Sequence, residues 1–204
     1  MLVTARQRFP APSAGEVMAA AERKAVENVL AAGVGAVQLR EKDLAGGLLF
    51  ARACLFRELC HRYGALLLVN DRVDVALAAG ADGVHLPAAG LSVVAARALL
   101  PAGAIIGRSA HGVGEIDAAA EADYMIFGPV YETPDKLSFG APQGIAGLAV
   151  AVAQSRAPVV AIGGIRPDRV AEVRRAGAAG VAAIGALLDD PTTVAGFAAE
   201  LAHR

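Results

Sequence analysis

The sequence predicts an α/β protein with one domain, residues 1–204, folded as a single (β/α)8 TIM barrel. The main observation is that short apolar runs alternate eight times with longer, alanine-rich segments. The apolar runs are continuous, which is typical of strands in a parallel sheet that is covered on both faces. Glycine ends several of the alanine-rich segments, where helices commonly terminate, and these glycines are Gly33, Gly64, Gly80 and Gly177.

The elements follow one another in a regular order. We expect strands over the apolar runs 1–5, 35–41, 65–70, 83–87, 104–109, 124–130, 158–164 and 180–187. We expect helices over the segments 14–33, 45–64, 72–80, 91–100, 112–122, 145–155, 166–177 and 190–204. Because strand–helix–strand connections are right-handed, this order gives a parallel sheet. Eight uninterrupted units favour a closed barrel, and a doubly wound open sheet is the alternative.

Composition and charge narrow the class of protein. The net charge is −1, so neither a broad basic surface nor a nucleic-acid partner is expected. No apolar stretch reaches the roughly 18 residues that span a bilayer. The first ten residues lack the apolar core of a signal peptide, so we expect a cytoplasmic protein without a membrane partner. Cys54 and Cys60 fall in one predicted helix, where they are expected to be buried free thiols.

Polar residues gather where the predicted strands end. In a barrel, chemistry belongs at the C-terminal ends of the strands. The polar residues at or after the ends of the second to sixth strands are Gln38, Arg40, Lys42, Asn70, Asp71, His85, Arg108, Ser109, His111, Tyr131, Thr133 and Lys136. Each has a simpler explanation alone, such as capping of the next helix by Asn70 or Asp71. Their convergence on one mouth indicates a binding site, with one or two histidines as proton carriers.

The last two strands indicate a phosphate site. Gly163 and Gly164 follow the seventh strand, and Gly185 follows the eighth, so backbone amides there are left uncovered. This is the usual phosphate position of a barrel, where N–H groups and a helix N-terminus face an anion. We expect the cations Arg40, Lys42 and Lys136 at the opposite side of the mouth. The residues therefore predict a phosphorylated small-molecule ligand.

Five ordered motifs extend this prediction. They are "VQLREKD", "LLVNDRVDVALAAGADGVHL", "IIGRSAHGVGEI", "DYMIFGPVYETPDK" and "VVAIGGI" with "GAAGVAAIGAL". Together they resemble the thiamine phosphate synthase/TenI family, over essentially the whole chain. The resemblance implies a barrel, usually a homodimer, that handles thiazole phosphates in thiamine biosynthesis. The family has two activities. The synthase joins hydroxymethylpyrimidine pyrophosphate to thiazole phosphate with magnesium on the pyrophosphate, and TenI-type proteins aromatise a thiazole phosphate carboxylate by proton transfer without a metal.

The resemblance also implies roles for individual residues. The substrate-binding residues implied are Gln38, Arg40, Lys42, Asn70, Ser109, Thr133 and Lys136. The phosphate-binding residues implied are Gly163, Gly164, Ala183 and Gly185. The acid or base of a tautomerase would come from His85, His111 or Asp71, and Asp71 matches a metal ligand of the synthase.

Three positions bear on the choice between the two activities. Two of them depart from the synthase pattern and one departs from the TenI pattern. Gly90 stands where the synthase has a second magnesium-binding aspartate, and Asp135 stands where it has a threonine. Pro129 stands where TenI-type proteins can carry a histidine. The expectation is a TenI-like thiazole tautomerase with no metal and no cofactor. The alternatives are the magnesium-dependent synthase and a non-catalytic thiazole-phosphate binder. The loop 131–143 is expected to be a mobile lid.

Overall fold

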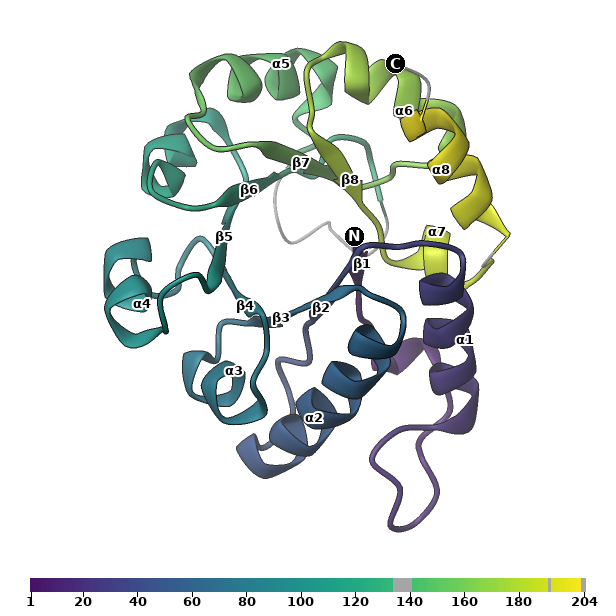
Figure 1. Cartoon of the computed structure of the whole chain (residues 1–204). Coiled ribbons are helices and arrows are strands. Elements are labelled where there is room, and N and C mark those ends of the chain that lie inside the picture. The colour runs from purple at the N-terminus through teal and green to yellow at the C-terminus, as the bar shows by residue number, and fades with distance from the viewer. Residues whose placement is uncertain (134–140, 191, 203–204) are drawn as a thin grey trace.

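The computed structural model describes residues 1–133, 141–190 and 192–202, and Figure 1 shows a ring of strands surrounded by helices. The strands are β1 (Leu2–Val3), β2 (Ala36–Leu39), β3 (Leu66–Asn70), β4 (Gly83–Leu86), β5 (Ile105–Ala110), β6 (Tyr124–Phe127), β7 (Val159–Ile162) and β8 (Gly180–Ala182). Each strand pairs in parallel with the next along the chain. This is the order that eight right-handed strand–helix units produce.

Helices cover the outside of the ring. The α-helices are α1 (Ala20–Ala31), α2 (Gly46–Arg62), α3 (Val73–Ala79), α4 (Val93–Leu99), α5 (Gly144–Gln154), α6 (Pro167–Arg175), α7 (Gly185–Leu188) and α8 (Thr193–Ala202). Two 3-10 helices, η1 (Arg6–Arg8) and η2 (Val113–Ala119), follow β1 and β5. No helix in the described ranges is long and apolar enough to cross a membrane.

Contacts between the first and last strands close the ring. Leu2 forms a parallel bridge with Ala183. The Val3 amide donates to the Ala183 carbonyl at 3.0 Å, and the Ala183 amide donates to the Met1 carbonyl at 3.1 Å. The predicted (β/α)8 barrel is therefore confirmed, and the alternative of an open, doubly wound sheet is wrong.

Several predicted elements are shorter than expected. The helix expected over 14–33 begins only at Ala20, because Pro12 and a turn at Gly15 (φ +85°) precede it. The strand expected over 180–187 ends at Ala182, and a short helix starts at Gly185 after Ile184 leaves the extended conformation. The helix expected over 112–122 is the 3-10 turn η2. The four glycines expected to end helices all have positive φ.

The core has an outer and an inner part. Outward-facing strand residues such as Leu67 and Val69 pack with helix residues such as Phe56 in a large cluster between the sheet and the helices. A smaller cluster fills the barrel interior and consists of Val3, Leu68, Tyr124, Ile126, Ile162 and Ala182. Because side chains alternate along each strand, continuous apolar runs supply both parts. Cys54 and Cys60 are free thiols, as expected, but only Cys60 is fully buried and Cys54 is half-buried.

Gly83 on β4 provides a test of the tight packing between strands. A Cβ atom added there would lie 1.9 Å from the Ile105 carbonyl oxygen, whereas one added at Gly47 on α2 would have open space. We expect Gly83→Ala to lower the free energy of unfolding by about 2 kcal/mol or more, because a packed core does not yield cheaply. Gly47→Ala should instead raise it by about 0.5–1 kcal/mol through helix propensity. Urea unfolding of both variants measures the difference, and equal stabilities would contradict this account.

Candidate active site at the barrel mouth

A small cavity lies at the C-terminal ends of the strands. Its volume is about 30 Å³. The predicted site residues that line it come from β2 to β5 and the segments just after them, and they are Gln38, Arg40, Asn70, His85, Ser109 and His111. Apolar residues of the inner cluster form its floor, including Val3, Ile126 and Ile162. The convergence expected from the sequence is thus a feature of the structure.

His85 is fixed in the barrel by two hydroxyl groups. Its side chain is 2% exposed. Its Nδ1 atom lies 3.0 Å from Tyr124 Oη, and its Nε2 atom lies 2.8 Å from Ser109 Oγ. In a neutral imidazole one nitrogen donates and the other accepts, and each hydroxyl can play either part. Burial raises the pKa of Tyr124, which keeps the phenol neutral.

A glycine makes the contact between His85 and Tyr124 feasible. His85 pairs with Gly107, and Gly107 pairs with Tyr124, across three adjacent strands. A Cβ atom at Gly107 would lie 2.0 Å from Tyr124 Cζ, so a side chain there would occupy the space of the phenol ring. The missing side chain on β5 therefore lets the histidine on β4 reach the tyrosine on β6.

His111 lies just beyond the end of β5 and is half-buried. Its Nδ1 atom lies 2.9 Å from the Gly128 carbonyl oxygen. A carbonyl can only accept, so Nδ1 carries the proton and Nε2 is the acceptor of the neutral ring. The His111 amide donates to Glu115 Oε2 at 2.7 Å, which holds the start of the following turn.

Gln38 and Arg40 place donors in the cavity. The Gln38 Nε2 atom is buried and, within the described ranges, has no hydrogen-bond partner. A buried donor without a partner costs about 1–3 kcal/mol, so a ligand acceptor at this position would relieve that cost. Burial lowers the pKa of Arg40, against the opposing effect of Glu41, yet the guanidinium stays charged at neutral pH. This side of the mouth therefore favours an oxygen-rich anion.

Asp71 lies beside the glycine that replaces the expected acid. Its backbone has φ +66°, a left-handed conformation that is unusual outside glycine. Its amide donates to the His85 carbonyl at 2.9 Å. A Cβ atom at Gly90 would lie 2.9 Å from Asp71 Oδ1 and 2.8 Å from Pro87 Cδ. An acid at position 90 would thus start next to the Asp71 carboxylate, but Pro87 occupies the room that its Cβ needs.

The magnesium that the resemblance implies for a synthase fits this mouth only with help from the substrate. Among the described residues no group of three or more His, Cys, Asp or Glu side chains could hold a metal ion. Asp71 offers one carboxylate, and magnesium is commonly held by one or two carboxylates together with substrate phosphates and water. A magnesium–pyrophosphate complex could use Asp71 in this way.

A second, larger cavity lies at the ends of β7 and β8. Its volume is about 540 Å³, and its lining includes the predicted phosphate residues Gly163, Gly164, Ala183 and Gly185 together with Thr133. The amides of Gly164 and Gly185 donate no hydrogen bond within the described part of the chain. The Ala183 amide differs, because it is used in closing the barrel. Two unused amides at one cavity suit an anion.

Three basic residues of this larger cavity were not predicted from the sequence, and they are Arg8, Arg166 and Arg169. Arg8, on η1, pairs with Asp189, its Nε lying 2.8 Å from Asp189 Oδ1. Arg169, on α6, lies over the Tyr131 ring at 4.3 Å and donates to the Gly164 carbonyl at 2.6 Å. Arg8 follows the first strand, and its position at a strand end could have identified it. The polar residues considered above follow only the second to sixth strands.

Other predicted residues lie elsewhere. Lys42 is exposed and does not line either cavity. Arg108 turns toward the segment after β4 and donates to the Leu91 and Ala88 carbonyls, so it supports the Gly90 turn. Lys136 and Asp135 lie outside the described residues, as does most of the segment expected to form a lid.

Comparison with known proteins agrees with this arrangement. The family model described as thiamine monophosphate synthase matches residues 12–187. A Geobacter sulfurreducens protein named "Putative thiamine-phosphate synthase" is 52% identical over 168 residues, 81% of this chain and 79% of that protein. The thiamine biosynthesis bifunctional protein ThiM/ThiE of Symbiobacterium thermophilum is 50% identical over 168 residues, 81% of this chain but 35% of that longer protein.

A solved structure extends the likeness to three dimensions. Thiamine phosphate pyrophosphorylase from Pyrococcus furiosus has 32% sequence identity and a TM-score of 0.83, with 98% of this chain and 93% of that chain covered. The family match covers well over half of the chain, and the Geobacter sulfurreducens protein is named for thiamine-phosphate synthesis as well. The chain belongs to the thiamine monophosphate synthase family.

Proposed function

We propose that the protein is a thiamine-phosphate synthase, which joins a pyrimidine pyrophosphate ester to a thiazole phosphate. The observation that carries this proposal is a pair of cavities at one mouth, each lined by hydrogen-bond donors that suit an anion. Arg40 and the unpartnered Gln38 amide line the small cavity, while the Gly164 and Gly185 amides line the large one. The two cavities share Ile162 and Ile184 as lining residues, so two ligands bound there would meet.

This arrangement suits a reaction between two phosphorylated substrates. The thiazole nitrogen forms a bond to the methylene carbon of the pyrimidine, and the bond from that carbon to pyrophosphate breaks. Holding both reactants at one mouth lowers the entropic part of the barrier. Arg40 would stabilise the negative charge that develops on the leaving pyrophosphate. Magnesium, when bound to pyrophosphate near Asp71, would neutralise further charge on that group.

The expected tautomerase is the second candidate. The observation that favours it is the Gly90–Pro87 turn, which leaves Asp71 without a second carboxylate beside it. Proton transfer on a thiazole phosphate would need the phosphate cavity and a base such as His111. His85 suits that role less well, because it is buried and both of its nitrogens are engaged. The names of the relatives support the synthase, and we therefore place it first.

An assay with each substrate separates the two activities. We expect magnesium-dependent formation of thiamine phosphate from the pyrimidine pyrophosphate and the thiazole phosphate, with release of pyrophosphate. The thiazole phosphate carboxylate tautomer alone should yield no aromatic product above the rate without enzyme. Chromatography of the products with and without magnesium measures both reactions. Aromatisation without coupling would replace the synthase proposal with the tautomerase.

The phosphate cavity can be tested at Gly185. A Cβ atom there would lie 3.0 Å from the Arg8 Nη2 and Asp189 Oδ2 atoms, the ends of flexible side chains, so Gly185→Ala should fold. Its methyl group would intrude on the anion, and we expect thiazole phosphate to bind about tenfold more weakly, a cost of about 1.4 kcal/mol. Gly180→Ala, at the start of β8, is the control, because its nearest contact is 3.9 Å away. Calorimetry that gives both variants equal affinity would contradict this placement.

Gly164 is a poorer position than Gly185 for testing the phosphate cavity. It has φ +62°, and a Cβ atom there would lie 2.7 Å from the Glu132 carbonyl oxygen. A valine would strain the backbone as well as meet the anion. Loss of binding in Gly164→Val would therefore not separate an effect on the ligand from an effect on the fold.

The acid that is missing at position 90 gives a further prediction. Gly90→Asp alone should be destabilised, because its Cβ would lie 2.8 Å from Pro87 Cδ. Gly90→Asp combined with Pro87→Gly should fold and place two carboxylates side by side. If the protein is a synthase, this double variant should reach half-maximal activity at roughly tenfold less magnesium, because a hard cation gains a charged oxygen ligand. Pro87→Gly alone is the control, and an unchanged magnesium requirement would contradict the role given to position 90.

A further inference from the structure

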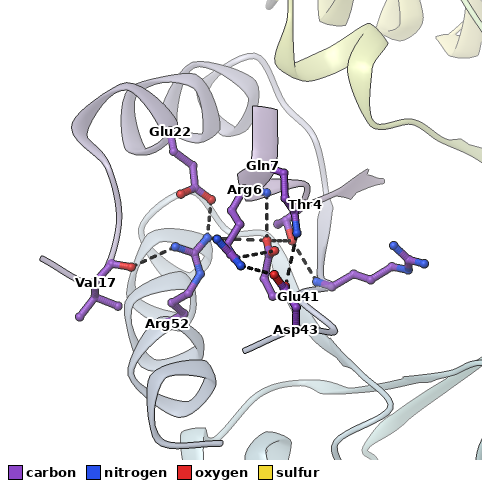
Figure 2. Close-up of polar contacts among 9 residues, drawn as sticks. Thr4, Arg6, Gln7, Val17, Glu22, Glu41, Asp43 and Arg52 are labelled. Atoms are coloured by element: carbon purple, nitrogen blue, oxygen red, sulfur yellow. Dashed lines mark hydrogen bonds and ion pairs between the residues drawn. The ribbon is translucent and has the colours of Figure 1, made fainter. Parts of the chain in front are cut away.

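A buried polar network lies behind the barrel mouth, between the strands β1 and β2 and the helices α1 and α2. Figure 2 shows its members pointing toward one another, with Glu41 among them. The Glu41 side chain is 0% exposed, and Glu41 is the second residue after the end of β2. Neither of the two cavities just described is lined by it. A buried carboxylate is costly, so its contacts call for a specific role.

Thr4 connects this carboxylate to the active-site backbone. The Thr4 hydroxyl donates to Glu41 Oε1 at 2.9 Å. The Thr4 Oγ1 atom in turn accepts a hydrogen bond from the Arg40 amide at 2.9 Å. An amide can only donate and a carboxylate can only accept, so the direction of both bonds is fixed. Arg40 is thus held through its backbone by the end of the neighbouring strand.

Two arginines stabilise the Glu41 carboxylate in this position. The Arg6 amide donates to Glu41 Oε1 at 3.3 Å, and Arg6 Nε lies 3.6 Å from Oε2. Arg52 Nη2 lies 3.7 Å from Glu41 Oε1 and also pairs with Glu22 on α1. Burial raises the pKa of Glu41, whereas the Thr4 hydrogen bond and the Arg52 charge oppose this effect. Buried ion pairs often add little net stability but can fix geometry.

The position of Glu41 in the chain gives this geometry its consequence. Glu41 lies between Arg40, which lines the small cavity, and Lys42. Successive side chains of an extended segment point to opposite faces, so anchoring Glu41 behind the sheet directs Arg40 into the mouth. We propose that Thr4 and Glu41 are positioning residues that hold Arg40 in place for the pyrophosphate group. This inference rests on the proposed function for the identity of that group.

Thr4→Val tests the connection, because valine keeps the shape of threonine and removes the hydroxyl. We expect pyrophosphate, in the presence of magnesium, to bind about five- to tenfold more weakly. This is the change in affinity that corresponds to the loss of roughly one hydrogen bond. The KM for the pyrimidine pyrophosphate should rise similarly, while the KM for thiazole phosphate should change by less than about twofold, since the other cavity is unaffected. Thr4→Ser restores a hydroxyl and should recover most of the affinity.

Glu22→Gln is the matched control for a merely structural role. Glu22 shares Arg52 with Glu41 and is buried, but within the described residues no hydrogen bond or ion pair joins it to Thr4 or Arg40. We expect it to lower the melting temperature and to leave pyrophosphate affinity unchanged. Glu41→Gln, a second variant, should lower that affinity because it weakens the acceptor for Thr4. If Thr4→Val binds pyrophosphate as tightly as wild type, or if Glu22→Gln binds it equally weakly, the positioning role is wrong.

The outcomes also separate this inference from the proposed function. If wild type binds pyrophosphate and Thr4→Val binds it more weakly, the positioning role is supported even when no thiamine phosphate forms. The absence of thiamine phosphate would then reject the synthase alone. Normal synthesis by wild type with an unchanged Thr4→Val would reject the positioning role and leave the synthase in place. A wild-type protein that binds no pyrophosphate would overturn the positioning role directly.

Discussion

The hydrogen bonds between β1 and β8 are the constraint on which the rest of the structure depends. They join Val3 and Ala183, residues far apart in the sequence, and convert eight consecutive strands into a ring. Closure brings Arg8, which follows β1, to the cavity at the end of β8. It also leaves the opposite edge of β1 for β2, where Thr4 meets Arg40 and Glu41. The first strand thus supplies contacts to both sides of the mouth, although it is only two residues long.

The two sides of the mouth handle negative charge in different ways. At the ends of β7 and β8, the cavity is lined by Gly164 and Gly185, whose amides donate no hydrogen bond to any described residue, and Arg8 there is paired with Asp189. At the end of β2, charge comes from a side chain, Arg40, which has to be directed. Backbone amides are placed by the fold alone, whereas a long side chain needs support from behind. This difference explains why a buried network lies behind Arg40.

The barrel and most of the residues at its mouth could be predicted from the sequence, because the patterns that indicate them are local or repeated along the chain. The eight apolar runs fixed the barrel, and the rule that sites lie at strand ends brought Gln38, Asn70, His85 and Ser109 together. Contacts between distant segments could not be predicted in the same way. Neither the reach of His85 past Gly107 to Tyr124 nor the contact of Thr4 with Glu41 leaves a pattern in nearby residues. The activity expected from Gly90, Asp135 and Pro129 differs from the one that the names of the relatives support, because three positions carry less information than a match over most of the chain.

The turn after β4 shows why one missing acid is a weak guide to the reaction. Pro87, Gly90 and Asp71 fit together as a unit, since a side chain at position 90 would meet both of the other two. Arg108 donates to the Ala88 and Leu91 carbonyls of the same turn. The turn is therefore a structured element with its own stabilising contacts. Such a turn leaves Asp71 as the carboxylate available to a magnesium–pyrophosphate complex. Magnesium accepts substrate oxygens and water in place of protein ligands, and the loss of one carboxylate therefore weakens a synthase site without removing its chemistry.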